Sequence, residues 1–237
     1  MAEAKPYIDE NDDVRCQTIS QSWANLRRVW VVRYTGTRGG SVTTVSFSHD
    51  GTLLAVGAID YSGHPSDDSN TSVYDVATGA LLHTLRRSST YGLAFSPIDR
   101  MVLAVGETSP TRIIIYNLAN GESSELWRAT DPDHQVMYHI NTLAYSPEAS
   151  TLAFCRQHMA AVIGIDGLVR VSPARVLATA TMDISGAVFS ATGAVLAVAV
   201  GTTIKCYDVA TGLVRNEFEY EGQVRDFTGS PRGIVSV

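Results

Sequence analysis

One unit of sequence recurs along the chain and constrains the fold more than any other feature. Each copy has an apolar stretch that ends in an aromatic residue and Ser, a short turn, a second apolar run, and a third run that closes on Tyr-Asp or Tyr-Asn. The clearest copies span 45–79, 93–121 and 187–212, a shorter one begins at Leu143, and a partial one occupies 224–237. The aromatic anchors are 48, 50, 44 and 38 residues apart, at Phe47, Phe95, Tyr145, Phe189 and Phe227. Such periods exceed the roughly 33–34 residues of two-helix repeats and fit four short strands per unit.

The residue types within the unit favour β-strands. Val, Ile, Thr and aromatic residues fill the runs, Gly, Asp, Asn and Ser-Pro separate them, and no stretch sustains a helical period. The run 53–56 is apolar on both strand faces, as a strand packed between two sheets requires. Asp50-Gly51 separates two runs and predicts a hairpin turn. The sequence therefore predicts an all-β protein of about five four-stranded sheets.

The repeat resembles that of the WD40 β-propeller family. The resemblance covers roughly residues 14–237 and rests on the turn at 47–51 and on the endings at 74–79 and 207–212, where Tyr-Asp stands in the place of the family's Trp-Asp. Asp68 matches the family's turn aspartate in the first blade, but no Gly-His pair precedes the Phe-Ser strands, so the family's His–Ser–Asp–Trp network is not available. The resemblance implies a β-propeller that serves as a non-catalytic adaptor in a multiprotein assembly. An acidic leader at 1–13 precedes this domain, and we expect it to be flexible.

The number of blades depends on both ends of the sequence. The partial copy at 224–237 supplies two inner strands, and residues 17–23 and 28–34 read as two further strands of the same blade. A blade shared in this way would close a five-bladed ring and leave no edge strand. The alternative is that the chain is a piece of a longer, seven-bladed propeller. The sequence leaves both interpretations open.

Charge and cysteine content argue against several classes of protein. Lys and Arg number 18 against 24 Asp and Glu, a net charge of −6, whereas general nucleic-acid binders carry a basic surplus. The three cysteines, Cys16, Cys155 and Cys206, form no CxxC pair, so neither a zinc site nor a redox motif is predicted. The longest apolar run, 194–200, is far shorter than the roughly 20 residues that span a bilayer, and the N-terminus has no apolar signal segment. We expect a soluble intracellular protein, cytoplasmic or nuclear.

The sequence contains no motif for catalysis or cofactor binding. It has no phosphate-binding Gly-rich loop, no GxGxxG, no GxSxG, and no HxH or HxxxH pair, so we expect no enzyme activity, no cofactor and no bound metal. One longer loop carries oxygen and imidazole groups of the kind that hold a cation, at Asp60, His64, Asp67 and Asp68. We favour the simpler interpretation of a solvated loop in which Asp68 bonds to its own turn.

Partner proteins are expected at the rim, where the outer strand of one blade leads to the inner strand of the next. The rim positions lie four residues before each aromatic anchor, at Thr43, Tyr91, Asn141, Ser185 and Gln223. Tyr91 near Arg86 and Arg87 is the best single patch, because Tyr and Arg supply much of the binding energy at interfaces. The alternative for Tyr91 is a side chain packed between blades.

The basic pair Arg86-Arg87 suggests a second function. The stretch 85–96 looks like the Phe/Leu-Arg-Arg-Gly signature of the phosphoinositide-binding propellers (PROPPINs), with Ser88 in place of the Gly. That resemblance implies lipid headgroup sites that use Arg86 and Arg87. No hydrophobic membrane-insertion loop follows, and an Arg pair after an outer strand is also ordinary protection of a sheet edge. The adaptor is the favoured function, and a phosphoinositide-binding membrane adaptor is the alternative.

Overall fold

A computed structural model describes the chain at residues 41–59, 70–86, 89–108, 110–130, 139–222, 224, 227–230 and 233–236. The chain divides into two compact units, residues 1–33 and 34–237, and all described residues belong to the second. The described residues of this unit form β-strands, turns and connecting segments, and none of them is helical. The strands form four antiparallel sheets of four or five strands and one two-stranded sheet, and we call each sheet a blade.

Each blade takes its strands from one continuous stretch of the chain. Blade 1 comprises β1 (Ser41–Phe47), β2 (Leu53–Ile59), β3 (Asn70–Asp75) and β4 (Leu81–Arg86). Blade 2 comprises β5 (Thr90–Phe95), β6 (Val102–Thr108), β7 (Thr111–Asn117) and β8 (Ser123–Arg128). Blade 3 comprises β9 (Ile140–Tyr145), β10 (Thr151–Arg156), β11 (Met159–Asp166), β12 (Val169–Arg170) and β13 (Arg175–Thr179). Blade 4 comprises β14 (Ile184–Phe189), β15 (Val195–Val200), β16 (Thr203–Asp208) and β17 (Val214–Glu219), and a partial blade 5 comprises β18 (Phe227–Ser230) and β19 (Gly233–Ser236).

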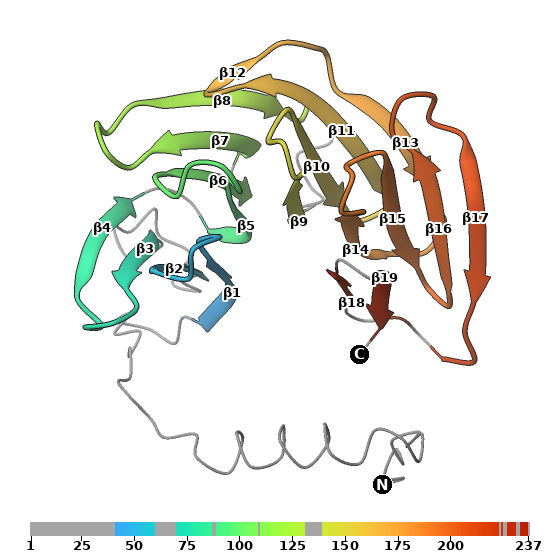
Figure 1. Cartoon of the computed structure of the whole chain (residues 1–237), viewed down its shortest axis with the longest axis horizontal. Helices are drawn as coiled ribbons and strands as arrows, with labels where there is room; N and C mark the ends of the chain where they lie inside the picture. Colours follow the sequence, from blue (N-terminus) through green and yellow to red (C-terminus); the bar gives the residue numbers. More distant parts are fainter. Residues whose placement is uncertain are drawn as a thin grey trace, which may run out of the picture. The chain divides into compact units, whose positions relative to one another are not determined.

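The blades follow one another in chain order, with the first strand of each next to the first strand of the following one (Figure 1). Within blades 1, 2 and 4 the strands pair in sequence order, first to fourth. This confirms the predicted all-β propeller architecture of four-stranded sheets. Residues 17–23 and 28–34, which were predicted to complete the fifth blade, lie outside the described residues. The closed ring and the longer propeller therefore both stay predictions.

The repeated Tyr-Asp endings owe their sequence to a turn between the third and fourth strands. Asp75 Oδ1 accepts hydrogen bonds from the Thr78 amide at 2.8 Å and from the Thr78 hydroxyl at 2.7 Å. Asp208 accepts the same two bonds from Thr211 in blade 4. Gly79 closes the turn at a φ of 73°, a left-handed conformation that favours glycine. These bonds lower the pKa of both carboxyl groups. The hydrogen-bonding needs of each Asp are therefore met within its own turn.

Apolar residues hold the blades together face to face. We call the face of a blade that meets the preceding blade its front and the opposite face its back. Leu93 and Phe95 on the front of blade 2 pack with Ala55 and Val73 on the back of blade 1. The fit is close, because a Cβ atom on Gly106 in blade 2 would lie 2.9 Å from the Cβ of Ile140 in blade 3. The glycine at the end of the Leu-Ala-Val-Gly run is therefore required by the next blade.

Blade 3 departs from the repeat in its outer strand, where the sequence repeat is also weakest. The long strand β11 pairs with β12 near one end and with β13 near the other. The break between β12 and β13 contains Ser172, whose hydroxyl accepts a hydrogen bond from the Gly164 amide at 2.9 Å. Asp166-Gly167, with Gly167 at a φ of 57°, replaces the Tyr-Asp turn of the other blades.

Candidate partner-binding face

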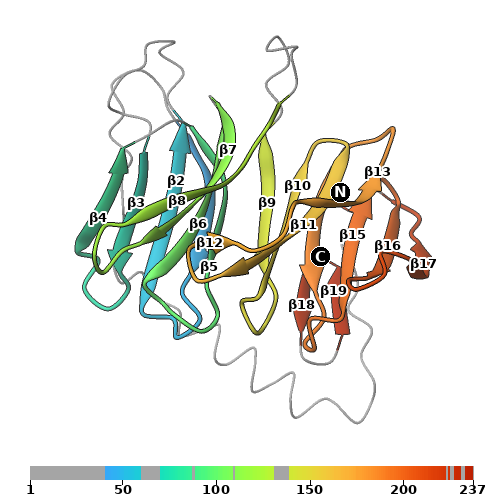
Figure 2. The same cartoon turned by 90° about the horizontal axis from the view of Figure 1, so that it is seen from above.

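The alternating strands of each blade create two faces of different construction. Turns between the first and second strands, and between the third and fourth, lie on one face, which we call the turn face. Turns between the second and third strands lie on the opposite face together with the links from blade to blade, and we call this the linker face. Figure 2 shows the strands of the successive blades running between these two faces. The four predicted rim positions that the structure describes, Thr43, Tyr91, Asn141 and Ser185, belong to the linker face.

Each described rim position is the bulged residue of its inner strand. The pairing with the second strand skips one residue at the start of β1, β5, β9 and β14. The skipped residues are Thr43, Tyr91, Asn141 and Ser185. A bulge changes the direction in which a side chain points, and bulges are common beside functional sites.

In blades 1, 3 and 4 the bulged side chain donates a hydrogen bond to a main-chain carbonyl at the start of the next blade or in the segment that leads to it. The pairs are Thr43 Oγ1 with Thr90 O, Asn141 Nδ2 with Ile184 O at 2.7 Å, and Ser185 Oγ with Val224 O at 2.6 Å. These residues therefore connect the blades as well as lining the rim. Such bonds across a partly buried joint contribute about 1 kcal/mol each.

In blade 2 the bulged residue makes an aromatic contact with the next blade. The rings of Tyr91 and His139 stack with centroids 3.9 Å apart and planes 12° from parallel. Both residues are half-buried, and burial lowers the pKa of His139. Tyr91 thus lies within the joint between blades 2 and 3, and its ring is held by His139.

The predicted rim position of the fifth copy, Gln223, lies outside the described residues, so it stays a prediction. The carbonyl that accepts a bond from the preceding blade is that of Ile184, directly before the bulged Ser185. Ser185 in turn donates to the carbonyl of Val224, which lies in the segment that leads to β18.

The basic and acidic candidates of the sequence fall mostly outside the described residues. Arg86 ends β4, and its side chain, together with Arg87, lies outside the described part of the chain. Residues 60–69, which include Asp60, His64, Asp67 and Asp68, lie outside it as well. The lipid site and the cation site therefore stay predictions.

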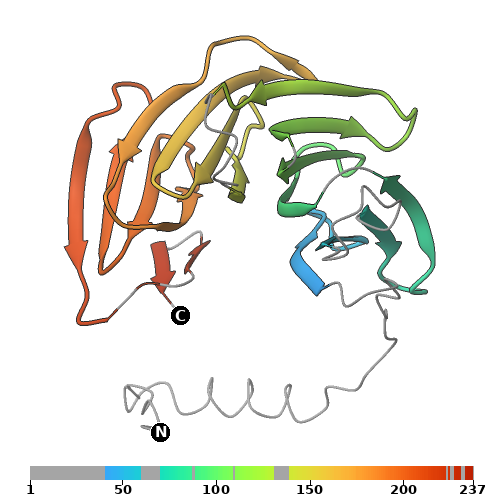
Figure 3. The ribbon, with the colours of Figure 1, turned by 180° about the vertical axis from the view of Figure 1, so that it is seen from behind.

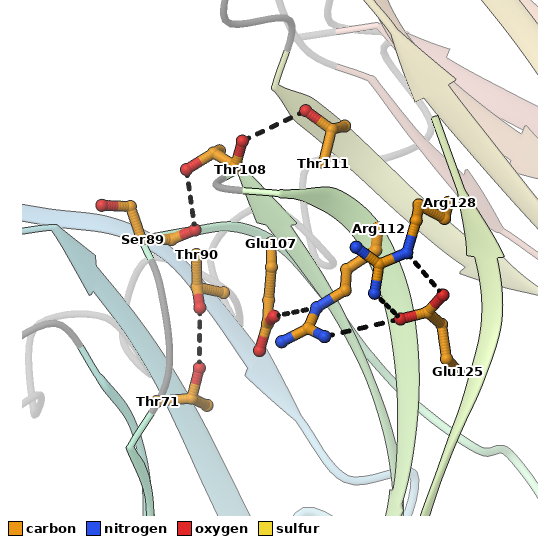
Figure 4. A network of polar contacts seen from close by, with 9 residues as sticks. All are labelled: Thr71, Ser89, Thr90, Glu107, Thr108, Thr111, Arg112, Glu125 and Arg128. Atoms are coloured by element: carbon orange, nitrogen blue, oxygen red, sulfur yellow. Dashed lines mark hydrogen bonds and ion pairs between the residues drawn. The ribbon is translucent and has the colours of Figure 1, made fainter. Parts of the chain in front are cut away.

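A polar network crosses the linker face from blade 1 to the outer strand of blade 2 (Figure 4). Glu107 is fully buried, and its Oε2 accepts a hydrogen bond from Arg112 Nε at 2.6 Å. Arg112 also reaches Glu125, which is bonded at 2.8 Å to Arg128 Nε. The hydrogen bond from Arg128 is the main reason that the pKa of Glu125 is lowered. Removing the partner of a buried carboxylate is strongly destabilising. Because Arg112 is the partner of buried Glu107, it is not free to bind a ligand.

Hydroxyl groups extend this network toward blade 1. Thr71 and Thr90 are buried, and their hydroxyl oxygens lie 3.0 Å apart across the joint between blades 1 and 2. Thr108 donates to the carbonyl of Ser89, and Thr111 donates to the carbonyl of Thr108 (Figure 4). The other carboxylate oxygen of Glu107, Oε1, is buried without a hydrogen-bond partner.

An open hollow of about 470 Å³ lies on the linker face where blades 3 and 4 meet. Its lining comes from the turn between β10 and β11, the link between β13 and β14, the start of β14, the turn between β15 and β16, and Val224. The lining residues are His158, Thr181, Met182, Asp183, Ser185, Gly201 and Val224. A smaller hollow of about 280 Å³ adjoins it and shares His158. The linker face is therefore recessed here.

The hollow combines polar groups with an exposed thioether. His158 Nδ1 lies 3.7 Å from Asp183 Oδ1, and both side chains reach solvent. Met182 is half exposed and packs over Gly201, where a Cβ atom would lie 2.9 Å from the Met182 sulfur. A side chain entering the hollow would meet an apolar surface beside a carboxylate and an imidazole.

Sequence reasoning identified only Ser185 among the residues of this hollow. His158, Met182 and Asp183 belong to no motif, and the one available signal was the departure of the third copy from the repeat. Sequence reasoning also did not identify Glu107. It directly follows the Leu-Ala-Val-Gly run of the second copy, at the position that Ala58 holds in the first copy.

The described residues contain no group of three or more His, Cys, Asp or Glu side chains that could hold a metal ion. Cys155 and Cys206 are free thiols, and full burial raises the pKa of Cys155 to about 12. In the part of the chain that the structure describes, no helix has the length and apolar character to span a membrane.

Comparison with known proteins supports the fold. No protein-family model matches the chain, and no curated protein matches it. Among solved structures, the chain is similar to the β-propeller domain of Cps50 (Swd1) from Myceliophteria thermophila, with a TM-score of 0.65 and 17% sequence identity. The match covers 86% of this chain and 64% of that one, so this chain spans less than two thirds of its length. At this identity the likeness concerns the β-propeller fold alone.

Proposed function

We propose that this chain is a protein-interaction module, and that a partner protein binds its linker face at the hollow between blades 3 and 4. The observation that carries the proposal is the convergence of separate chain segments on one recess lined by His158, Met182 and Asp183. The WD40 resemblance of the repeats, which implies an adaptor in a multiprotein assembly, agrees with it. The role as a scaffold and a cytoplasmic or nuclear location are parts of the same proposal.

The rigid strands around the hollow favour binding. The lining residues lie at strand ends or in short turns and links, so little chain has to be ordered when a partner arrives. Met182 offers an adaptable apolar contact, and the His158–Asp183 pair offers hydrogen-bonding groups beside it. A recess of this composition suits an apolar or amphipathic side chain that projects from a partner protein.

The same geometry argues against a nucleophile at this site. His158, Asp183 and Ser185 line one hollow, which raises the question of a catalytic triad. The Ser185 hydroxyl, however, donates its hydrogen to the Val224 carbonyl at 2.6 Å. Activation of a serine requires that this hydrogen be directed to the base, so Ser185 serves the joint between blades.

Two charge insertions test the proposal on the full chain. Met182→Arg places a bulky cation in the hollow, whereas Ala191→Arg places the same group on an exposed turn of the turn face in blade 4. Tagged wild type is used to capture partners from cells that express it, and each partner is then produced and titrated against the three proteins. We expect Met182→Arg to weaken binding at least tenfold and Ala191→Arg to leave it unchanged. Equal losses, or a loss only with Ala191→Arg, would contradict a linker-face site.

A further inference from the structure

The joint between blades 3 and 4 carries a carboxylate that makes no hydrogen bond to the described residues. The two blades lie side by side, with the yellow strands of blade 3 next to the orange strands of blade 4 (Figure 3). Asp183 lies in the link between β13 and β14, and 75% of its side chain is exposed. Its one ionic neighbour there is His158, whose Nδ1 lies 3.7 Å away, which is too far for a hydrogen bond. The carboxylate of Asp183 is therefore accessible to a ligand.

Asp183 is the one carboxylate among the described residues that line the larger hollow. The other lining residues are uncharged apart from the imidazole of His158, and they include the exposed thioether of Met182. The permanent cation Arg156 lines only the smaller, adjoining hollow. A group that enters the larger hollow therefore meets a negative charge beside an apolar surface, and its electrostatic complement is a cation.

Several polar groups around the hollow are already used by the joint itself. The Ile184 amide donates to the Gln157 carbonyl at 2.6 Å, and the Val224 amide donates to the Gly201 carbonyl at 2.9 Å. The hydroxyl of Ser185 donates to the carbonyl of Val224. A partner that added a strand to a blade would need a row of free main-chain groups. Recognition in this hollow therefore depends on side chains, and Asp183 is the charged one.

The turn that carries His158 has a strained backbone. Gln157 has a φ of 39°, in the left-handed region that residues other than Gly rarely adopt. The hydrogen bond from the Ile184 amide holds the carbonyl of Gln157, so packing against blade 4 maintains the strain and fixes the position of the turn. Strained residues of this kind cluster at functional sites. The turn is a second, independent indication that this part of the linker face binds a ligand.

We propose that the hollow binds a basic side chain of the partner protein, a lysine or an arginine, together with an apolar side chain of the same segment. This inference rests on the proposed function and names the chemistry of its partner. The ammonium or guanidinium group pairs with the Asp183 carboxylate, and the apolar side chain lies against Met182, toward Met159 in the smaller hollow. Side chains two residues apart on an extended segment share one face, so both can enter together. The net charge of −6 also attracts a basic partner from a distance.

Short synthetic peptides test the inference on the full chain without a captured partner. The probes are Gly-Ser-Leu-Ser-Arg-Ser-Gly and Gly-Ser-Arg-Ser-Leu-Ser-Gly with blocked ends, each matched by peptides in which citrulline or Glu replaces Arg. Citrulline keeps the shape of Arg without its charge. In NMR spectra of protein labelled on its methionine methyl groups, at least one Arg peptide should shift the signals of Met182 and Met159. The signal of Met101, on the turn face between β5 and β6, should stay unshifted. The matching citrulline and Glu peptides should bind about fivefold more weakly or less.

Charge reversal at Asp183 separates this site from the general charge of the chain. Asp183→Lys should invert the preference, so that a Glu peptide binds better than the matching Arg peptide. The matched control is Asp166→Lys, which changes the net charge equally at an exposed position on the turn face, where β11 leads to β12. This control should keep the wild-type preference for Arg. Both positions are exposed, so both variants should fold, and circular dichroism checks that they do.

Three results would overturn the inference. They are an unshifted Met182 with every peptide at millimolar concentration, equal binding of the Arg and citrulline peptides, and equal effects of Asp183→Lys and Asp166→Lys. The proposed function fails by a different result, namely a captured partner that binds Met182→Arg as well as it binds the wild type. A partner that loses binding in Met182→Arg but not in Asp183→Lys would leave the proposed function standing and would refute a basic occupant.

Discussion

The turn face and the linker face are built from the same repeats in different ways. On the turn face, the short turns bond to themselves, as when Asp75 accepts two hydrogen bonds from Thr78. On the linker face, one repeat position, the residue after the second strand's apolar run, differs in every blade. The residues there are Ala58, Glu107, Arg156 and Val200. Local backbone geometry dictates the turn face, whereas the linker face has to satisfy only the joints between blades, so its other residues are available for binding.

The largest expected difference between the faces concerns two glycines. Gly106 lies against Ile140 at a blade joint, and Gly121 has open space around it but a φ of 77°. Gly106→Ala should cost about 2–3 kcal/mol through overpacking, and Gly121→Ala about 1 kcal/mol through backbone strain. Asn separates the two causes. It tolerates a left-handed backbone better than Ala does, so it should cost less than Ala at position 121, but it is larger than Ala, so it should cost more at position 106. Urea unfolding should therefore rank Asn milder than Ala at 121 and worse at 106, and the same ranking at both sites would contradict this difference.

A pair of asparagines gives the next largest effect. Asn141 donates to the Ile184 carbonyl on the linker face, whereas Asn117 accepts from the Ala119 amide on the turn face. Replacing Asn by Asp keeps the side-chain oxygen that accepts hydrogen bonds and removes the amide group that donates them. Asn141→Asp should therefore destabilise the fold by about 1–2 kcal/mol, and Asn117→Asp by less than about 0.5 kcal/mol. Thermal unfolding at pH 7 measures both. If Asn117→Asp cost as much as Asn141→Asp, the bond from Asn141 would not be what joins blades 3 and 4.

The pH dependence of stability should separate the faces further. Burial lowers the pKa of His139, so below its usual value of 6.5 the unfolded chain takes up a proton that the folded chain resists, and stability falls as the pH drops. The turn-face carboxyls of Asp75 and Asp208 also have lowered pKa values, so they lose stability only below about pH 4. Unfolding free energies measured from pH 8 to pH 3 should show both declines.

The variant His139→Phe keeps an aromatic ring against Tyr91 and cannot be protonated. It should remove the decline that begins near pH 6.5 and leave the one below about pH 4. An unchanged profile between pH 5 and 7 would show that His139 does not carry this dependence.

The smallest expected effect concerns membranes. The adaptor function predicts that the full chain does not float with liposomes, whether or not they contain phosphoinositides. Lipid-dependent flotation that is lost in the double variant Arg86→Ala, Arg87→Ala would instead establish the phosphoinositide-binding alternative. In that case the linker face would bind lipid through the segment that follows β4.

The fold could be predicted because its determinants are local and repeated. The hairpin at Asp50-Gly51 forms as expected, with Gly51 at a φ of 70°. The anchors Phe95 and Phe189, which set the spacing of the repeat, are both buried. Each depends on residues within one copy of the repeat. Phe47 has the same local sequence and a different environment, because its burial depends on what lies against the blade and not on its own strand.

The candidate site was harder to predict because it is not repeated. His158, Met182 and Asp183 lie up to 25 residues apart and meet only when blade 3 packs against blade 4. The rim register did place Thr43, Tyr91, Asn141 and Ser185 near the start of their inner strands, on the linker face, since the position of an inner strand follows from its anchor. Their hydrogen bonds to the next blade depend on the joint, which no single copy of the repeat encodes.

Hydrogen–deuterium exchange of the full chain, with and without a captured partner, tests the central claim most directly. If the linker face binds the partner, protection should appear in peptides that contain residues 156–159 and 180–185 and should be absent from the turn-face peptides at 48–52 and 190–194. Protection confined to the turn-face peptides would contradict the account and would move the binding site to the opposite face of the blades.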